Sequence, residues 1–218
     1  GSVGWGAETA GKQLNQLAGR IVAPTPPLRD RLIDAGCALL TEGGLEALTL
    51  RRCAARAGVS HAAPAHHFDG LPGLLRAIAE RGFTRFADAM EAERDHAHDA
   101  PRARLHAICR GYMAFALEND ALFTLMFRKN RGIGAFDASL GQAAERASGI
   151  LTDACAPFVP DGVPAKVIEV QVWSLIHGYA FLAVCDQINS AATPDGYHRT
   201  APFDDVMTLL DRIGEDRP

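Results

Sequence analysis

Residues 49–68, TLRRCAARAGVSHAAPAHHF, predict two short helices joined by a tight turn, the pattern of a helix-turn-helix. Thr49 can cap the first helix, because its side-chain oxygen can accept a hydrogen bond from a backbone N–H of the first turn. The apolar positions that follow recur at helical spacing: Leu50, Cys53, Ala54 and Ala57. This narrow stripe gives the first helix one buried face.

The turn is predicted at Gly58, because glycine adopts the left-handed backbone conformation at little steric cost. Val59 is then placed to point inward, and Ser60 is a ready cap for a second helix that starts at His61 and ends at Phe68. Small residues dominate this second helix, so it can approach a partner surface closely.

The same stretch is strongly basic, although the whole chain carries a formal charge of −4. Arg51, Arg52 and Arg56 stand against no Asp or Glu between residues 49 and 68, which gives a local charge of 3 − 0 = +3. A polyanion is the natural partner of such a patch. An ordinary helical hairpin with a solvated arginine face fits the pattern as well and stays open on the residues alone.

Together with a helix predicted from Leu28 to about Gly43, this stretch resembles the DNA-binding end of the TetR family of bacterial transcriptional regulators. The resemblance is a connected run of about forty residues, which makes it far more specific than a single short motif. The matching positions are Thr49, Ala54, Ala57, Gly58, Val59, Ser60, His66, His67 and Phe68.

The resemblance implies that the second helix of the motif enters the major groove of DNA. Histidine side chains can donate or accept hydrogen bonds at base edges, and alanine methyls can contact thymine methyls. The residues expected to face the bases are His61, Ala62, Ala63, Ala65 and His66. The residues expected to hold phosphates, and so to fix the register, are Thr49, Arg51, Arg52 and Ser60.

Two positions depart from the family pattern. Ala65 stands where the family usually has tyrosine, and Leu71 stands where it usually has lysine. Hydrogen bonds to charged groups are worth on the order of 1.5 to 3 kcal/mol each, so we expect weaker DNA binding than is typical of the family, with a shallower salt dependence.

A second resemblance lies in residues 111–127, GYMAFALENDALFTLMF, and residues 172–178, VWSLIHG. Both are similar to the ligand-sensing domain of a TetR subgroup whose last long helix carries a Trp-x-x-x-His-Gly signature. That signature is Trp173, His177 and Gly178 in this sequence.

Aromatic and methionine side chains in these segments form either plain core or the apolar wall of a ligand pocket. The candidates for an effector site are Tyr112, Phe115, Phe123, Met126, Phe127, Trp173 and His177. Trp173 and His177 lie four residues apart on one helix face. That spacing is compatible with two arrangements. In one, His177 is buried and hydrogen-bonded beside a core tryptophan, and in the other, both side chains line a cavity.

Helical periodicity continues along most of the chain, without a convincing alternating pattern of strands. Further helices are expected at residues 71–97, 102–118, 120–130, 136–157, 163–187 and 203–213, separated by prolines. The fold class is therefore all-α. We expect a flexible arm at residues 1–27, a three-helix DNA-binding domain at residues 28–75, and a helical ligand-binding and dimerisation domain at residues 76–218.

The composition indicates a globular protein and limits where in the cell it is expected. With 218 residues and 48% hydrophobic content, the chain can bury a sizeable core. No run of about 18 apolar residues is evident and the beginning lacks the layout of a signal peptide, so we expect a cytoplasmic protein without a membrane partner. The cysteines lack a Cys-x-x-Cys pair and are expected to be buried, reduced thiols: Cys37, Cys53, Cys109, Cys155 and Cys185.

Neither a metal site nor an enzyme is indicated. His61 and His66 of one short helix point to different sides and cannot converge on one ion, and residues 95–99, DHAHD, are typical of a solvated helix end. The sequence contains no Gly-x-Ser-x-Gly elbow, phosphate-binding glycine loop or His-Glu-x-x-His motif. We therefore expect no catalytic residues, no metal and no cofactor.

These observations lead to one hypothesis, a homodimeric repressor that a small apolar molecule releases from its operator in double-stranded DNA. The family resemblance implies that the helices near residues 163–187 and 203–213 form the dimer contact. The alternative is an α-helical ligand-binding or interaction protein that retains this fold and has lost DNA binding.

Overall fold

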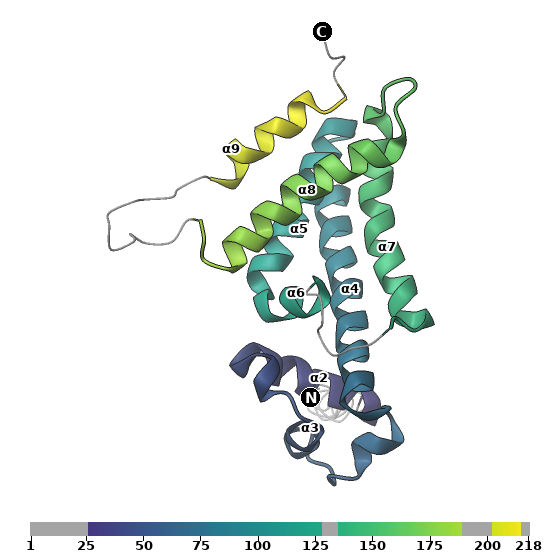
Figure 1. Cartoon of the computed structure of the whole chain (residues 1–218), viewed down its shortest axis with the longest axis vertical. Helices are drawn as coiled ribbons and strands as arrows, with labels where there is room; N and C mark the ends of the chain where they lie inside the picture. The colour runs from purple at the N-terminus through teal and green to yellow at the C-terminus, as the bar shows by residue number, and fades with distance from the viewer. Residues whose placement is uncertain (1–25, 128–134, 189–201, 215–218) are drawn as a thin grey trace, which may run out of the picture.

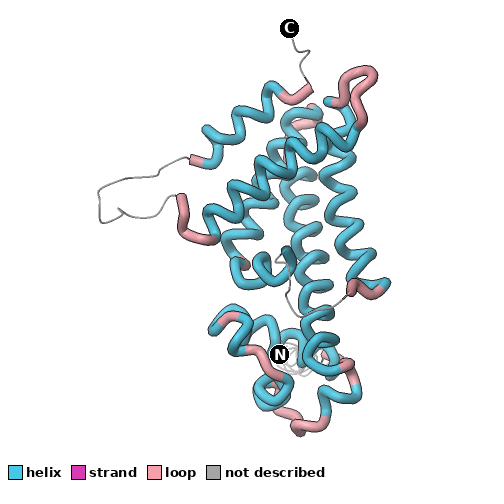
Figure 2. Tube along the Cα trace, in the orientation of Figure 1, coloured by secondary structure: helices cyan, strands magenta, loops and turns pink. Residues whose placement is uncertain are grey.

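Helices form the fold throughout the part of the chain that the computed structural model describes, residues 26–127, 135–188 and 202–214 (Figure 2). No strand occurs within those ranges, so the all-α prediction is confirmed. The α-helices are α2 Leu28–Gly43, α3 Leu50–Arg56, α4 Gly70–His96, α5 Pro101–Glu118, α6 Asp120–Phe127, α7 Ala138–Cys155, α8 Ala165–Val184 and α9 Phe203–Met207. The 3-10 helices are η1 Leu45–Ala47, η2 Ala63–His66, η3 Ala156–Phe158 and η4 Thr208–Arg212. Most of the predicted arm, residues 1–25, lies outside the described residues.

A small head at one end of the molecule contains α2, α3 and η2 (Figure 1). The Thr49 side chain accepts a hydrogen bond from the N–H of Arg52 at 3.2 Å, which confirms the predicted cap of α3. Cys53 and Ala54 are fully buried against the rest of the head. Gly58 has a φ of 68°, the left-handed value that the turn requires.

The second helix of the motif is shorter than predicted. In place of an α-helix from His61 to Phe68, the structure has a turn followed by the 3-10 helix η2. The cause is Pro64, which has no N–H to give to the carbonyl of Ser60 in an α-helical hydrogen bond. That carbonyl accepts instead from the N–H of Ala63 at 3.1 Å, the tighter spacing of a 3-10 turn.

The long helix α4 joins the head to the body of the molecule (Figure 1). Its 27 residues extend over about 40 Å at 1.5 Å per residue. Apolar side chains on α4 are buried from Leu74 near the head to Met90 near the far end, and they belong to one hydrophobic core that also includes α2 side chains. The predicted domain boundary at residue 75 therefore falls inside a continuous helix.

Ion pairs and hydrogen bonds fasten the head to α4 and to itself. Arg81 of α4 donates to Asp30 of α2 at 2.8 Å and also pairs with Asp34. Within the head, the guanidinium of Arg31 donates to the carbonyl of Ala57 at 2.5 Å and so ties α2 to the end of α3. Because exposed ion pairs contribute at most about 1 kcal/mol each, these contacts orient the head while the apolar core provides most of the cohesion.

The helix α8 crosses the body obliquely (Figure 1). One of its faces leaves large apolar side chains in solvent. Its exposed large side chains are Val167, Val170, Trp173, Phe181 and Leu182. By length and composition α8 could cross a membrane, although no such segment was expected from the sequence. A single helix of this kind is weak evidence for a membrane span, because core helices of water-soluble proteins pass the same test. The segment formed by α9 and η4 lies beside it.

The cysteines are all thiols, in agreement with the expected reduced state. Cys53, Cys109 and Cys155 are buried, and burial raises the pKa of Cys109 to about 12 and that of Cys155 to about 11. Two cysteines that were expected to be buried are not: Cys37 is half-buried and Cys185 is exposed. Cys185 directly follows the last residue of α8.

We predict that Gly111→Ala destabilises the body, because α5 lies on α4 at this position. A Cβ at Gly111 would lie 2.5 Å from the carbonyl oxygen of Ala89, a backbone atom that cannot rotate away. The expected loss in the free energy of unfolding is about 1 to 3 kcal/mol. The control is Gly149→Ala on α7, where nothing lies within 4 Å and a gain of up to about 1 kcal/mol is expected. Equal effects in urea unfolding would contradict this packing.

Candidate functional site

The η2 segment presents the residues that were expected to face DNA bases. His61, Ala62, Ala65 and His66 are exposed and Ala63 is half-buried. Pro64 and Phe68 are buried and anchor the segment in the head, and the Arg29 guanidinium lies over the Phe68 ring, 5.7 Å from its centroid. The head therefore displays a small exposed segment that carries the imidazoles of His61 and His66 and is held by buried apolar side chains.

The residues that were expected to hold phosphates lie beside this segment. Thr49, Arg51, Arg52 and Ser60 are all exposed, and no ion pair engages Arg51 or Arg52 within the described part of the chain. The structure thus brings both groups of predicted DNA-facing residues to one surface of the head.

The local charge of this surface is smaller than the sequence alone indicates. Arg56 donates to both carboxylate oxygens of Glu42, at 2.6 and 2.5 Å. The hydrogen bonds from Arg56 hold the pKa of Glu42 below its usual value. With this carboxylate counted, the charge is 3 − 1 = +2, so Arg51 and Arg52 carry the available positive charge.

The body contains a cavity of about 250 Å³, open to solvent on one side, that is lined by residues of α4, α5, α6, α7 and α8. Its lining residues are Phe83, Phe86, Met90, Tyr112, Phe127, Ala144, Ala147, Ser148, Leu151, Lys166, Glu169 and Trp173. Tyr112, Phe127 and Trp173 were among the predicted effector-site residues. The wall is mostly apolar, five of its side chains are aromatic, and its polar groups are few.

The other predicted effector-site residues lie behind this wall. Phe115, Phe123 and Met126 are at most 3% exposed and do not line the cavity. They support residues that do: the ring of Phe123 lies 4.9 Å from that of Phe127, and the ring of Phe115 lies 5.2 Å from that of Phe86, centroid to centroid.

His177 lies behind the cavity wall, whereas Trp173 is part of that wall. The Nδ1 atom of His177 is hydrogen-bonded to the Tyr112 hydroxyl at 2.7 Å, and its ring lies 4.8 Å from that of Phe127. Burial lowers the pKa of His177, so the imidazole is neutral at pH 7. Trp173 is 44% exposed and belongs to the cavity wall, so the interpretation as a core tryptophan is wrong.

Sequence reasoning missed the contributions of α4, α7 and the beginning of α8. Phe83, Phe86 and Met90 fall in the helix predicted at residues 71–97, and a cavity wall cannot be recognised in one helix alone. A signal for the polar pair did exist, because Lys166 and Glu169 precede Trp173 by seven and four residues and so share its helix face.

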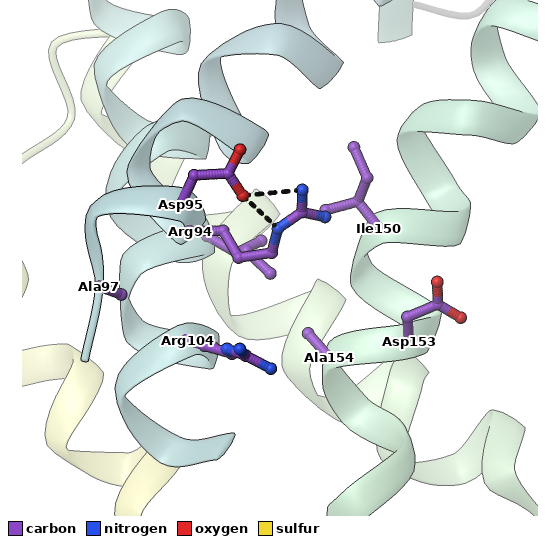
Figure 3. Close-up of a pocket in the computed structure, with 8 residues that line it drawn as sticks. Arg94, Asp95, Ala97, Arg104, Ile150, Asp153 and Ala154 are labelled. Carbon is purple, nitrogen blue, oxygen red and sulfur yellow. Dashed lines mark hydrogen bonds and ion pairs between the residues drawn. The ribbon is translucent and has the colours of Figure 1, made fainter. Parts of the chain in front are cut away.

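A second hollow, of about 530 Å³, lies at the end of the body away from the head, between α4, α5 and α7 (Figure 3). Charged side chains line much of it, and three of them are paired with neighbours: Arg94 with Asp95 at 3.0 Å and Arg104 with Asp99 at 2.6 Å. Because these side chains are in contact with solvent, the aromatic cavity is the better candidate for a ligand site.

Two segments of the chain match the N-terminal and the C-terminal domain of one protein family. Residues 32–78 match the description "Bacterial regulatory proteins, tetR family", and residues 105–202 match "Tetracyclin repressor-like, C-terminal domain". The HTH-type transcriptional regulator BetI 2 of Chromohalobacter salexigens is 41% identical over 92 residues, which is 41% of this chain and 44% of that protein. The chain thus matches less than half the length of such curated relatives.

Solved structures extend the likeness over most of the chain. A protein of unknown function from Rhodococcus sp. RHA1 has a TM-score of 0.69 at 31% identity, over 88% of this chain and 95% of that one. FadR of Bacillus subtilis, solved in complex with stearoyl-CoA, has a TM-score of 0.61 at 16% identity, over 86% of this chain and 98% of its own. The second likeness concerns the fold alone.

We predict that His177 makes the stability of the protein sensitive to pH below about 6.5. Because its folded pKa is lowered, the unfolded chain binds the proton first, and stability falls as the pH drops below the ordinary histidine value. His177→Gln should flatten the change in unfolding free energy between pH 7 and 5. His96→Gln, at an exposed position on α4, serves as the control. An unchanged pH profile for His177→Gln in urea titrations would contradict the assignment.

Proposed function

We propose, from the premise that this chain belongs to the TetR family of bacterial regulatory proteins, that it is a dimeric transcriptional repressor released from its operator by a small molecule. The observation that carries the proposal is the exposed surface formed by η2 and the beginning of α3. A regulator of this kind acts on chromosomal DNA, and so in the cytoplasm.

The shape of η2 suits the major groove of DNA. The groove is about 12 Å wide and admits one helical segment. Alanine side chains at three of the five predicted base-facing positions allow the backbone to approach, and His61 and His66 carry ring nitrogens for base edges. Arg51 and Arg52 would then reach the flanking phosphates, which fix the register.

A second copy of the chain is the partner that fits the outer face of α8. That face exposes Val170, Phe181 and Leu182, and Gly178 lies among them with nothing within 4 Å. A glycine inside a helix costs about 1 kcal/mol relative to alanine. Its absent side chain leaves room for a crossing helix, which would place two heads on one duplex.

The connection between cavity and head runs through α6. Phe127 at the end of α6 lines the cavity, whereas the earlier part of the same short helix packs against α2 of the head. A molecule that favours one position of Phe127 would therefore also favour one position of the head. Only such a difference in affinity between two states can shift the equilibrium between them.

The DNA-binding surface is tested by salt dependence. We predict that Arg52→Gln lowers affinity for a duplex from the upstream region of the gene and reduces the slope of log affinity against log salt by about 1.8, because each of the two heads of the dimer loses one phosphate contact. Arg56→Gln is the matched control, since Arg56 is already bound to Glu42. Fluorescence anisotropy measures both. A flat salt response of the unmodified protein would favour a fold that has lost DNA binding.

The dimer is tested at Gly178. We predict that Gly178→Arg yields monomers in sedimentation velocity at concentrations where the unmodified protein is dimeric, because a charged side chain would fill the crossing point. Gly149→Arg is the control, as a glycine on α7 that also has nothing within 4 Å. Dimers that persist in Gly178→Arg, or monomers in both variants, would contradict this interface.

A further inference from the structure

The polar groups at the edge of the aromatic cavity are unequally buried. Lys166 and Glu169 are three residues apart on α8, and their side chains form an ion pair at 2.5 Å. The Glu169 side chain is 15% exposed, whereas that of Lys166 is 72% exposed. The negative charge of Glu169 also contributes to the raised pKa of the Cys155 thiol on α7, so the carboxylate lies toward the interior. The cavity is therefore negative on its inner side, with the ammonium group outside.

The rest of the wall has the same electrostatic sign. Five aromatic side chains line the cavity, and aromatic ring faces carry negative potential that attracts cations: Phe83, Phe86, Tyr112, Phe127 and Trp173. Phe86 presents its ring in edge contact with Tyr112 and Phe127, at interplanar angles of 81°. Apart from Lys166, no basic side chain is among the described residues that line the cavity.

The size of the cavity limits its occupant. At about 250 Å³ it lies below the usual range of about 300 to 1,000 Å³ for sites that hold drug-sized ligands. A compact molecule fits within this volume.

We infer that the cavity takes a compact organic monocation, whose charged end lies against Glu169 and the aromatic rings and releases Lys166 to solvent. This inference rests on the proposed effector function of the cavity and names the chemical class of the effector. It also differs from the small apolar molecule expected from the sequence, because Glu169 is not among the predicted effector-site residues.

Binding of an anion and binding of a cation would differ in the free-energy cost of leaving Glu169 without a partner. An anion would have to draw Lys166 inward and leave the mostly buried carboxylate of Glu169 without a partner, and an unpaired buried charge is strongly unfavourable. A cation replaces Lys166 on that carboxylate, and the released ammonium group is already mostly in water. The structure thus favours a cation on the grounds of desolvation as well as of ring electrostatics.

Binding of isosteric probes tests the inference without DNA. The chain has two tryptophans, so Trp5→Phe leaves Trp173 as the fluorescent reporter at the cavity. The probes are phenyltrimethylammonium, its neutral isostere tert-butylbenzene, and the anion benzenesulfonate. We expect the cation to bind at least about tenfold more tightly than the neutral probe, the change that a cation–π contribution of about 1.4 kcal/mol gives.

Variants assign that preference to the ion pair. In the same background, Glu169→Gln should lower affinity for the cation about tenfold and change affinity for the neutral probe less than about twofold. Lys166→Met should raise affinity for the cation. Glu118→Gln removes an exposed carboxylate at the end of α5 and should change nothing. Thermal unfolding of each variant establishes that it is folded.

The outcomes separate this inference from the proposed function. Equal affinity for cation and neutral probe, tighter binding of benzenesulfonate, or no effect of Glu169→Gln would overturn the cationic effector even if the protein binds its operator. Conversely, the predicted probe pattern in a protein that binds no duplex would overturn the repressor and leave the cation site standing.

Discussion

The buried apolar face of α4 is the constraint on which the rest of the structure depends. The helix is too long to serve one domain alone, and its buried side chains from Leu74 to Met90 pack first against the head and then against α5, α6 and α7. Because these contacts belong to one core, the head cannot tilt without disturbing the packing of the body. The cavity lies along the same helix, since Phe83, Phe86 and Met90 are part of its wall. Core, cavity and head orientation are therefore set together.

Much of the fold could be predicted from local patterns. Apolar periodicity located each described α-helix, and the cap at Thr49 and the turn at Gly58 follow from the chemistry of single residues. The error in the second helix of the motif has a local cause as well. Pro64 removes only one donor near the first turn, yet in so short a segment this loss decides between an α-helix and a 3-10 turn.

The site was less predictable, because its properties arise between elements that lie far apart in sequence. Glu42 and Arg56 are 14 residues apart, and their pairing lowers the charge of the head surface in a way that no count along the chain reveals. The cavity wall combines side chains from five helices. Aromatic residues in one helix cannot show whether a partner helix fills the space beside them or leaves it open. Phe123 and Phe127 illustrate this, since one is core and the other is wall.

The size of the cavity places a demand on how a signal reaches DNA. Moving a two-state equilibrium from 1:99 to 99:1 requires a difference of about 5.5 kcal/mol in ligand affinity between the states. A compact ligand has few atoms with which to supply that difference, and contacts that it makes equally in both states do not shift the equilibrium. The difference must arise where the wall itself moves with the head. Phe127 meets this requirement, because it touches the cavity and its helix α6 packs on α2. Trp173 and Glu169 lie on α8, whose main packing partners are α5, α7 and α9 of the body. They therefore suit recognition of the ligand, whereas α6 suits transmission.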